Sequence, residues 1–566
     1  MYVEAVPNRD SPPAILLRES WREGGRTLKK TIANLSDWPK HKIDALRRVL
    51  RDENLVSVNE VFSIERTIPH GHVEAVLGTI HKLGLPAILS SRPCRERDLV
   101  MGMITERLIS PGSKLATTRT WSSTSLGEQL AIKDAAVDEL YSALDWLLAR
   151  QTRIEAKLAK HHLENGALVL YDTSTSFYTG RRCPLAHFGH DRDKKGLPVI
   201  LYGVLTNAEG CPVAVEVYPG NTGDPKTVGD QVTKLQKQFS LSSVVIVGDR
   251  GMLTQTQIDL LKQREDVGWI SCLRSHSIRE LVHKRLIQPS LFDDRNLAEI
   301  ISPSFPGERL VACFNHALAT ERTRKREELL QVTEKRLEAL AREVKRRTRK
   351  PLGKDEIGLK AGKTLGRFKM GKHFQLKIGE GSFEWNRREE TILREAALDG
   401  IYVIRTSLPK EQLSAEDAVR SYKNLSVVER VFRCLKGVDI LVRPIHHRTE
   451  DRVRAHIFLC MLAYYVEWHM RRALAPLLFH DEELSADRAI RDPVAPAKPS
   501  ASAKAKKAAR ETSDGLPLHS FKTLLKDLAT RSKSLCRMGS GPDAPTITRT
   551  SEPSPLQARA FDLLGL

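Results

Sequence analysis

Two short apolar runs, each ending in an aspartate, constrain the fold of this chain most strongly. Gly166–Asp172 (GALVLYD) and Ser243–Asp249 (SVVIVGD) have the length and composition of strands that are buried on both faces. Because a buried charge is costly unless it is compensated, Asp172 is expected where its strand ends, facing a cation, a basic partner or solvent. The alternative is that Asp172 only caps the following turn, since Thr173–Thr175 are turn formers.

The segment between the two runs predicts how they pair. Pro198–Thr206 and Pro212–Tyr218, joined by Asn207–Gly210, have the pattern of a β-hairpin. Asp224 and Pro225 are a typical helix start, with Asp as the cap and Pro at the first position. The apolar stripe of this expected helix consists of Val228, Val232, Leu235 and Phe239. A right-handed crossover would then place the second apolar run parallel to the first in one sheet.

Parallel strands place their carboxyl ends at the same edge of a sheet, where ligands bind in open α/β sheets. Asp172 and Asp249 would repel each other at this edge unless a cation lay between them. Carboxylate oxygens suit Mg²⁺ or Mn²⁺. The two strands therefore predict a metal site.

A third carboxylate occurs in a segment with helical spacing. Tyr422, Leu425, Glu429, Phe432 and Lys436 recur at steps of three and four residues, so they are expected on one helical face. If this helix packs beside the sheet edge, Glu429 completes a site of three carboxylates. The alternative is a core-facing helix in which Glu429 and Ser426 form a capping box, and the two interpretations can coexist.

These segments together resemble the DDE transposases of bacterial insertion sequences, in the group with a Tyr-Arg-Glu-Lys signature. The group's pattern is Tyr, two residues, Arg, three residues, Glu, six residues, Lys. Tyr422, Glu429 and Lys436 match this pattern, and Leu425 stands where the group has Arg. In the family that Arg helps to hold a phosphate of the transposon end. Lys423 and Arg430 are the candidates to replace it.

The resemblance extends over residues 1 to about 480. Tyr171–Ser174 is similar to the family's first acidic motif, and Gly248–Gly251 is similar to its second. The long interval between the second and third carboxylates resembles the family's mostly β insertion. Leu17–Gly25 and Gly220–Thr222 also resemble segments of one branch of these proteins.

The resemblance implies an α/β fold with a ribonuclease-H-like catalytic core, interrupted by a large mixed helix and β insertion. It implies catalytic, metal-binding roles for Asp172, Asp249 and Glu429, with two Mg²⁺ ions about 3.5–4 Å apart, for which Mn²⁺ can substitute. The implied DNA contacts come from Tyr422, Lys436, Arg250 and Arg433. The implied activity is cleavage of DNA at the element's terminal inverted repeats and strand transfer into target DNA, by a homodimer when the two ends are joined.

Two other functions remain open at this stage. One is a metal-dependent nuclease without strand transfer. The other is a catalytically inactive, transposase-derived DNA-binding protein, which the presence of all three carboxylates disfavours.

Composition supports a nucleic-acid partner. The 90 Lys and Arg against 70 Asp and Glu give a net charge of +20, which favours a polyanion, and nucleic acid before a membrane. The eight cysteines are scattered without a Cys-x-x-Cys pair, which disfavours a zinc ribbon or disulfide framework and fits a reducing cytoplasm. The most apolar segment, Ile457–Val466, is too short to span a bilayer. A soluble bacterial protein, associated with the nucleoid through DNA, is expected.

Histidines offer weaker metal-site candidates. His187 and His190 have no third ligand at a suitable spacing, so a surface loop is the favoured interpretation. His446, His447 and His456 are expected to be packing or phosphate-side residues.

The expected domain organisation has six parts. Residues 1–65 form a basic β-rich module with a hairpin turn at Gly24–Gly25, and 66–165 form a helical, candidate DNA-binding region. The catalytic core comprises 166–274, with Trp269–Arg274 as its last strand, and 411–480, with the Glu helix and a buried helix over Val453–Leu474. The insertion occupies 275–410 and includes a long charged helix over Glu321–Arg349. Residues 481–566 are expected to be a basic tail: a flexible linker over 493–512, an amphipathic helix over Ser520–Ser532, and an unstructured end.

Overall fold

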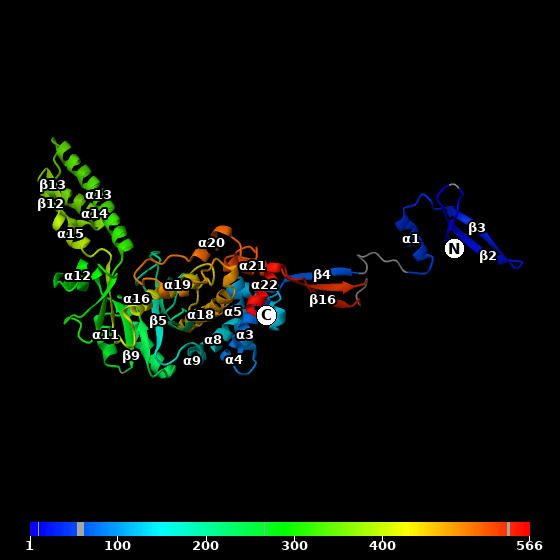
Figure 1. Cartoon of the computed structure of the whole chain (residues 1–566), viewed down its shortest axis with the longest axis horizontal. Coiled ribbons are helices and arrows are strands. Elements are labelled where there is room, and N and C mark those ends of the chain that lie inside the picture. The colour runs from blue at the N-terminus through cyan, green and yellow to red at the C-terminus, as the bar shows by residue number, and fades with distance from the viewer. Residues whose placement is uncertain (10, 54–61, 265, 540–543) are drawn as a thin grey trace. The chain divides into compact units, whose positions relative to one another are not determined.

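The computed structural model describes residues 1–9, 11–53, 62–264, 266–539 and 544–566 (Figure 1). The chain divides into two compact units. The first unit comprises Met1–Pro69 and Arg531–Glu552, and the second comprises His70–Thr530 and Pro553–Leu566. In the described ranges, no helix combines the length and the apolar composition that crossing a membrane requires.

The first unit contains two small antiparallel sheets. One sheet has the order β1 (Tyr2–Val6), β2 (Ala14–Glu23), β3 (Arg26–Asn34), and α1 (Lys40–Val49) follows it. The turn between β2 and β3 is formed by Gly24 and Gly25, both with positive φ, so the predicted hairpin is confirmed. The other sheet has the order β16 (Thr546–Thr550), β15 (Ser532–Met538), β4 (Phe62–Pro69).

The C-terminal region is more ordered than its sequence suggested. The expectation of an unstructured end is wrong, because β15 pairs with both β16 and β4, and α22 (Pro555–Leu564) packs against two other helices of the second unit, α3 and α18. The expectation of a flexible linker over 493–512 is also wrong. Ala and Lys are good helix formers, and here they form α20 (Ala501–Ala509), capped by the Ser500 side chain. The amphipathic helix is confirmed as α21 (Phe521–Leu528).

An eight-stranded mixed sheet is the centre of the second unit. Its order is β10 (Leu297–Ile300), β11 (Arg309–Phe314), β14 (Ile401–Thr406), β9 (Val267–Cys272), β8 (Val244–Val247), β5 (Ala167–Phe177), β6 (Val199–Asn207), β7 (Pro212–Pro219). β5, β8 and β9 are parallel neighbours, and the other pairs are antiparallel. The β6–β7 hairpin and the parallel pairing of β5 with β8 are confirmed. The prediction that β9 is the last strand is wrong, because β14, β11 and β10 continue the sheet beyond it.

The register between β5 and β8 corrects the expected position of Asp172. The parallel ladder ends where Leu170 pairs with Val247, but β5 continues to Phe177. The strand continues because its second half still pairs with β6, with Asp172 opposite Val204. Asp172 therefore lies within its strand, and the hydroxyl residues after it are buried in the sheet and do not form a turn.

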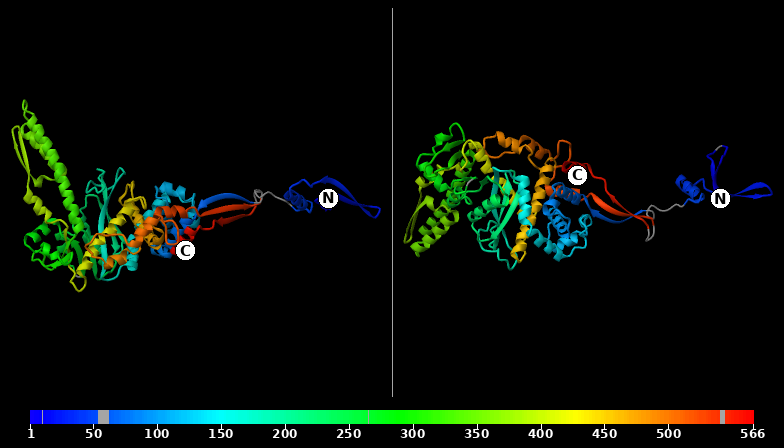
Figure 2. Two further views of the ribbon diagram at one scale, coloured as in Figure 1. Left: turned by 45° about the horizontal axis from the view of Figure 1, so that its top comes forward. Right: turned by 90° about the horizontal axis from the view of Figure 1, so that it is seen from below.

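Helices cover both faces of this sheet (Figure 2). Val169 and Tyr171 of β5 belong to the hydrophobic cluster that includes α10 and α11, whereas Leu170 belongs to the cluster that includes α16–α18. The first group of helices is α9 (Gln151–His162), the short η1 (Asp224–Thr227), α10 (Val228–Thr233), η2 (Lys234–Gln238) and α11 (Gln255–Lys262). The second group is α16 (Ala415–Lys423), α17 (Leu425–Lys436) and α18 (Glu450–Ala473). The predicted apolar stripe of the crossover helix is confirmed, with Val228, Val232 and Leu235 fully buried.

The region before the sheet is helical, as predicted. It contains α3 (Gly71–Lys82), α4 (Leu85–Leu89), α5 (Arg95–Ile109), α6 (Lys114–Thr120), α7 (Leu126–Gln129), α8 (Val137–Leu148) and α9. α18 packs against α3, α5, α8, α17 and β7, so most of its surface is buried, as its apolar sequence predicted.

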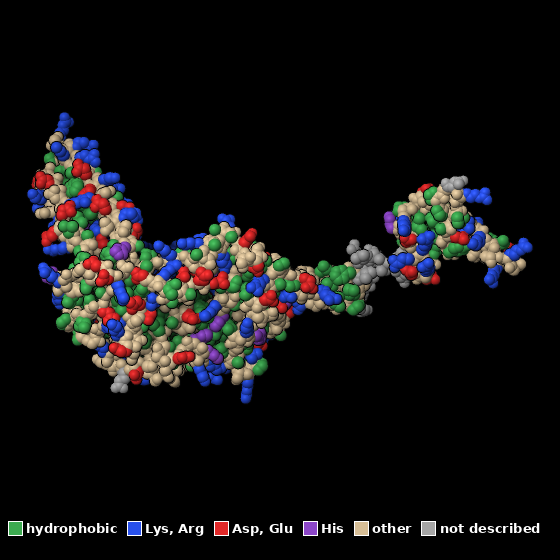
Figure 3. All heavy atoms as spheres, viewed as in Figure 1, with side chains coloured by type: hydrophobic (Ala, Val, Ile, Leu, Met, Phe, Trp, Pro, Cys, Tyr) green, Lys and Arg blue, Asp and Glu red, His purple; other side chains and the backbone are tan. Residues whose placement is uncertain are grey.

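A helical module with its own core lies between β11 and β14. It consists of α13 (His316–Arg346), α14 (Lys354–Phe368), η4 (Gly371–His373), β12 (Phe374–Gly379), β13 (Ser382–Arg387) and α15 (Glu389–Ala396). Its buried residues, among them Leu330, Leu337 and Phe374, form a separate hydrophobic cluster. The long charged helix is confirmed as α13, and Lys and Arg side chains lie along the outer surface of the module (Figure 3). α12 (Ser275–His283), η3 (Pro289–Phe292), η5 (Ala475–Leu477) and α19 (Leu484–Ile490) complete the unit.

Candidate active site

Asp172 and Asp249 lie at equivalent positions relative to the ladder between the parallel strands β5 and β8, Asp172 within β5 and Asp249 just after β8. Leu170 and Val247 are the last register pair of β5 and β8, and each aspartate follows its pair member by two residues. Side chains alternate along a strand, so Asp172 lies on the same face as Leu170, which is the face that α17 covers. The structure thus brings both aspartates to the end of the β5–β8 ladder, with Asp172 on the face that α17 covers.

The surroundings of Asp172 disfavour its charged form. Burial is the main cause that raises the pKa of Asp172 to about 7, and the charges of Asp249 and Asp224 act in the same direction. Arg192 and the Thr173 backbone N–H, which donates to Asp172 Oδ1 over 2.7 Å, act in the opposite direction. Three acidic side chains are therefore close enough to influence one titration, which is the arrangement that a bound cation would stabilise.

Asp249 is exposed and held by local hydrogen bonds. Its Oδ1 accepts the backbone N–H groups of Gly251 over 2.9 Å and of Met252 over 2.7 Å. These bonds fix the carboxylate at the point where β8 ends.

Glu429 lies on an exposed side of α17. The core-facing side of this helix consists of Val428, Val431, Phe432 and Leu435, and the ring of Phe432 lies 5.8 Å from the ring of Tyr202 on β6. Within the described residues, the carboxylate oxygens of Glu429, Asp172 and Asp249 do not all lie within 4.8 Å of one another. The structure therefore packs α17 against β5 but leaves the three carboxylates short of one closed cluster.

The segment expected as one helical face is divided between two helices. Tyr422 belongs to α16 and Glu429 to α17, because the chain tightens at Asn424, whose carbonyl accepts the Val427 N–H over 2.8 Å. Burial raises the pKa of the Tyr422 hydroxyl, and the nearby charge of Asp249 adds to this effect. The capping-box interpretation is wrong, because Ser426 lies inside α17, which has no side-chain cap.

The loop after β5 supplies charged residues that the sequence did not identify. Arg192 bonds to the Thr173 carbonyl and, over 3.1 Å, to Asp224 Oδ2. The prediction that Asp224 caps a helix is wrong, because Gly223 occupies the cap position and Asp224 is the first residue of the turn. The Asp224 side chain instead accepts a hydrogen bond from Thr173 Oγ1 over 2.8 Å. The sequence shows that this loop is rich in charged residues. It does not show that the loop folds back onto β5, because that contact depends on tertiary structure.

A basic cluster surrounds Asp193 in the same loop. Arg443 Nη1 lies 2.5 Å from one oxygen of Asp193, and Lys436 Nζ lies 4.0 Å from the other. Burial lowers the pKa of Lys436 to about 8, and Arg192 and Arg443 lower it as well, whereas Asp193 raises it. The structure thus places Lys436 beside the loop that contacts β5.

The other basic candidates differ in position. Arg250 and Arg433 are exposed, the first directly after Asp249 and the second in the last turn of α17. Lys423 Nζ donates to the carbonyls of Val494, over 2.9 Å, and Ala495, so it is already engaged elsewhere. Arg430 is exposed on α17, beside Glu429 in the sequence.

Two of the histidine candidates, His456 and His447, are packed inside the protein, whereas the other three are exposed. His456 is buried, and its Nε2 lies 2.8 Å from the Val442 carbonyl oxygen. Burial also lowers the pKa of His447 to about 4. His187 pairs through its backbone with Val199.

A family model described as a transposase DDE domain matches residues 174–466, which is more than half of the chain. The chain belongs to the DDE transposase family. The match includes Asp249 and Glu429 and begins two residues after Asp172. No curated protein matches the chain. Members of this family act on DNA and generally use divalent metal ions, for which carboxylate oxygens are suitable ligands.

Proposed function

We propose that this transposase cleaves DNA at the ends of an insertion element and transfers the strands into target DNA, with Asp172, Asp249 and Glu429 as its catalytic carboxylates. The sheet order β7-β6-β5-β8-β9, with only β5, β8 and β9 parallel, supports a ribonuclease-H-like core. The observation that carries the proposal is the pair of aspartates at one level of β5 and β8.

The donor set fits Mg²⁺ or Mn²⁺. Asp172 and Asp249 offer carboxylate oxygens, and the raised pKa of Asp172 reflects a charge that a cation would compensate. When bound, two such ions would activate the attacking oxygen and stabilise the leaving oxygen of a phosphodiester.

The protein's own groups would hold and orient the DNA. Glu429 would complete the ligand set from α17, and Lys436, two turns further along the same helix, would contact the phosphates of the element end. Arg192 is paired with Asp224, and Arg443 is paired with Asp193. A DNA phosphate would replace each carboxylate as the partner of its arginine. Tyr422, Arg250 and Arg433 are the further proposed DNA contacts. A homodimer would join the two ends.

Joining of DNA tests this proposal against a nuclease. Purified protein and Mg²⁺ are incubated with labelled element ends and a target plasmid, beside Asp249→Asn and the control Asp259→Asn. Asp259 is an exposed carboxylate of α11, outside the proposed site. We expect joined products with the wild type and the control, and DNA binding without joining for Asp249→Asn. Cleavage without joined products would favour the nuclease, and joining by Asp249→Asn would remove Asp249 from the site.

A further inference from the structure

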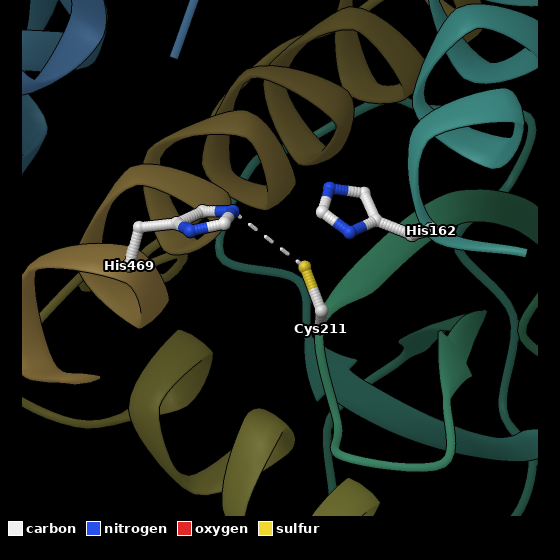
Figure 4. A group of neighbouring side chains, drawn as sticks. All are labelled: His162, Cys211 and His469. Carbon is white, nitrogen blue, oxygen red and sulfur yellow. Dashed lines mark hydrogen bonds between the residues drawn. The ribbon is translucent and has the colours of Figure 1, made fainter. Parts of the chain in front are cut away.

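Two histidines and a cysteine, none of them part of the proposed carboxylate site, converge at a junction of three elements. His162 is the last residue of α9, Cys211 directly precedes β7, and His469 lies in α18 (Figure 4). One ligand atom from each of these residues lies within 4.8 Å of the others. Cys211 Sγ lies 3.9 Å from His469 Nε2. The three side chains therefore surround one small space.

The positions of these ligand atoms are fixed by other contacts. The Cys211 N–H donates to Asn207 Oδ1 over 2.9 Å, which fixes the β6–β7 turn. His162 Nε2 lies 3.0 Å from the Tyr465 hydroxyl, and Tyr465 precedes His469 by one turn of α18. A hydrogen-bond partner of this kind orients a metal-binding imidazole in known sites.

The ligand set differs chemically from the carboxylate edge. A thiolate with two imidazoles suits Zn²⁺, whereas Mg²⁺ requires oxygen ligands. With Zn–S near 2.3 Å and Zn–N near 2.0–2.1 Å, a tetrahedral ion holds sulfur and nitrogen roughly 3.6 Å apart. The observed 3.9 Å is within a few tenths of an ångström of that separation.

We propose that His162, Cys211 and His469 bind one Zn²⁺ ion that links α9, β7 and α18. On binding, the Cys211 thiol releases its proton to solvent and the thiolate coordinates the ion. His162 and His469 are half-buried, so a water molecule completes the tetrahedron from the open side. Because α18 also packs against α17, the ion stabilises the support of the helix that carries Glu429.

Co²⁺ is the probe, because its visible spectrum reports a tetrahedral thiolate site. Full-length protein is freed of metal with a chelator and titrated with Co²⁺ in excess Mg²⁺, which occupies oxygen sites. We expect one Co²⁺ per chain with a thiolate charge-transfer band, and displacement of that Co²⁺ by Zn²⁺. A wild-type protein that shows no such band overturns the proposal without any substitution.

Two variants test the ligands, and a third is a control. Cys211→Ser removes the thiolate and should abolish the band, and His162→Gln should weaken Co²⁺ binding at least about tenfold. Cys94→Ser is the matched control, since Cys94 is a half-buried thiol at the start of α5, and it should behave as wild type. Circular dichroism verifies folding. An unchanged charge-transfer band in Cys211→Ser contradicts the proposal. Unchanged Co²⁺ affinity in folded His162→Gln also contradicts it. If Cys211→Ser does not fold, the result for His162→Gln decides the ligand assignment.

Discussion

At the scale of single residues, Asp172 connects stability to metal binding. Its pKa in the folded protein is raised from 3.8 to about 7, above its value in the unfolded chain. The contribution of Asp172 to the free energy of unfolding is therefore fully present below about pH 4, where the carboxyl is protonated in both states. This contribution is lost as the pH rises through 7, because the folded protein disfavours the charged form. A metal ion that compensates the charge should restore the loss.

Asp172→Asn removes the ionisable group from this position. In the presence of a metal chelator, we expect the free energy of unfolding of the variant to rise relative to that of wild type between pH 4 and pH 8. The expected gain at pH 8 is about 1–2 kcal/mol after allowance for the partial exposure of Asp172. Mg²⁺ should raise the melting temperature of wild type more than that of the variant. Melting curves of both proteins across this pH range measure the effect. A stability difference between variant and wild type that does not change with pH would contradict the unfavourable ionisation of Asp172.

Arg443 tests the basic cluster around Asp193. Arg443→Gln should weaken binding of element-end DNA and reduce the slope of log affinity against log salt by about one, because one phosphate contact is lost. The control is Arg279→Gln, an exposed arginine on α12. Fluorescence anisotropy at several salt concentrations measures both quantities. An unchanged slope would place Arg443 outside the DNA interface.

At the scale of elements, the position of α17 depends on a close approach at Gly210. This glycine has φ +86°, and a Cβ there would lie 2.2 Å from Val427 Cγ1. The β6–β7 turn thus determines how closely the start of α17 can approach the sheet.

Gly210→Ala should displace α17, destabilise the protein by about 1–3 kcal/mol and reduce DNA cleavage without altering any carboxylate. Gly196→Ala is the control, since Gly196 has φ +67° and a Cβ there would meet no atom within 4 Å, so it measures the cost of the backbone conformation alone. Adding Val427→Ala to Gly210→Ala should recover part of the activity. Full activity of Gly210→Ala would show that α17 is not positioned by this contact.

Sequence reasoning succeeded where the signal was local. The apolar runs around Leu170 and Val247 predicted two parallel strands, and Asp249 was expected where it is found. It failed where pairing partners are distant: β5 extends past Asp172 because β6 supports it, and Arg192 reaches β5 only because its loop folds back. Of the two residues considered as replacements for the family's Arg at Leu425, Lys423 is engaged elsewhere.

At the scale of the whole molecule, the ends of the chain illustrate the same limit. β15 pairs with β4 across more than 460 residues, and no local pattern indicates that pairing. The three strands β10, β11 and β14 were likewise assigned to an insertion, although they extend the main sheet.

The α13–α15 module should be separable from the sheet. Its two ends meet where the Asn315 N–H donates to the Gly400 carbonyl over 2.9 Å, and its hydrophobic cluster is its own. Replacing residues 318–397 with a short Gly-Ser linker should leave a protein that unfolds cooperatively and is still stabilised by Mg²⁺. Its DNA affinity should fall, because the basic run Lys345–Lys350 is removed. Loss of cooperative unfolding, measured by calorimetry, would show that the sheet depends on the module.

Three carboxylates, one in β5, one just after β8 and one in α17, are proposed to form one metal-dependent DNA-cleaving site. Glu429 is the member that most needs a test, because among the described residues its carboxylate does not join both aspartates in one cluster. The most direct measurement is Mg²⁺-dependent cleavage at the ends of the element by wild type, Glu429→Gln and the control Glu411→Gln, an exposed glutamate that precedes α16. We predict cleavage by wild type and control only, with DNA binding retained by all three. Cleavage by Glu429→Gln at the wild-type rate would contradict the three-carboxylate site.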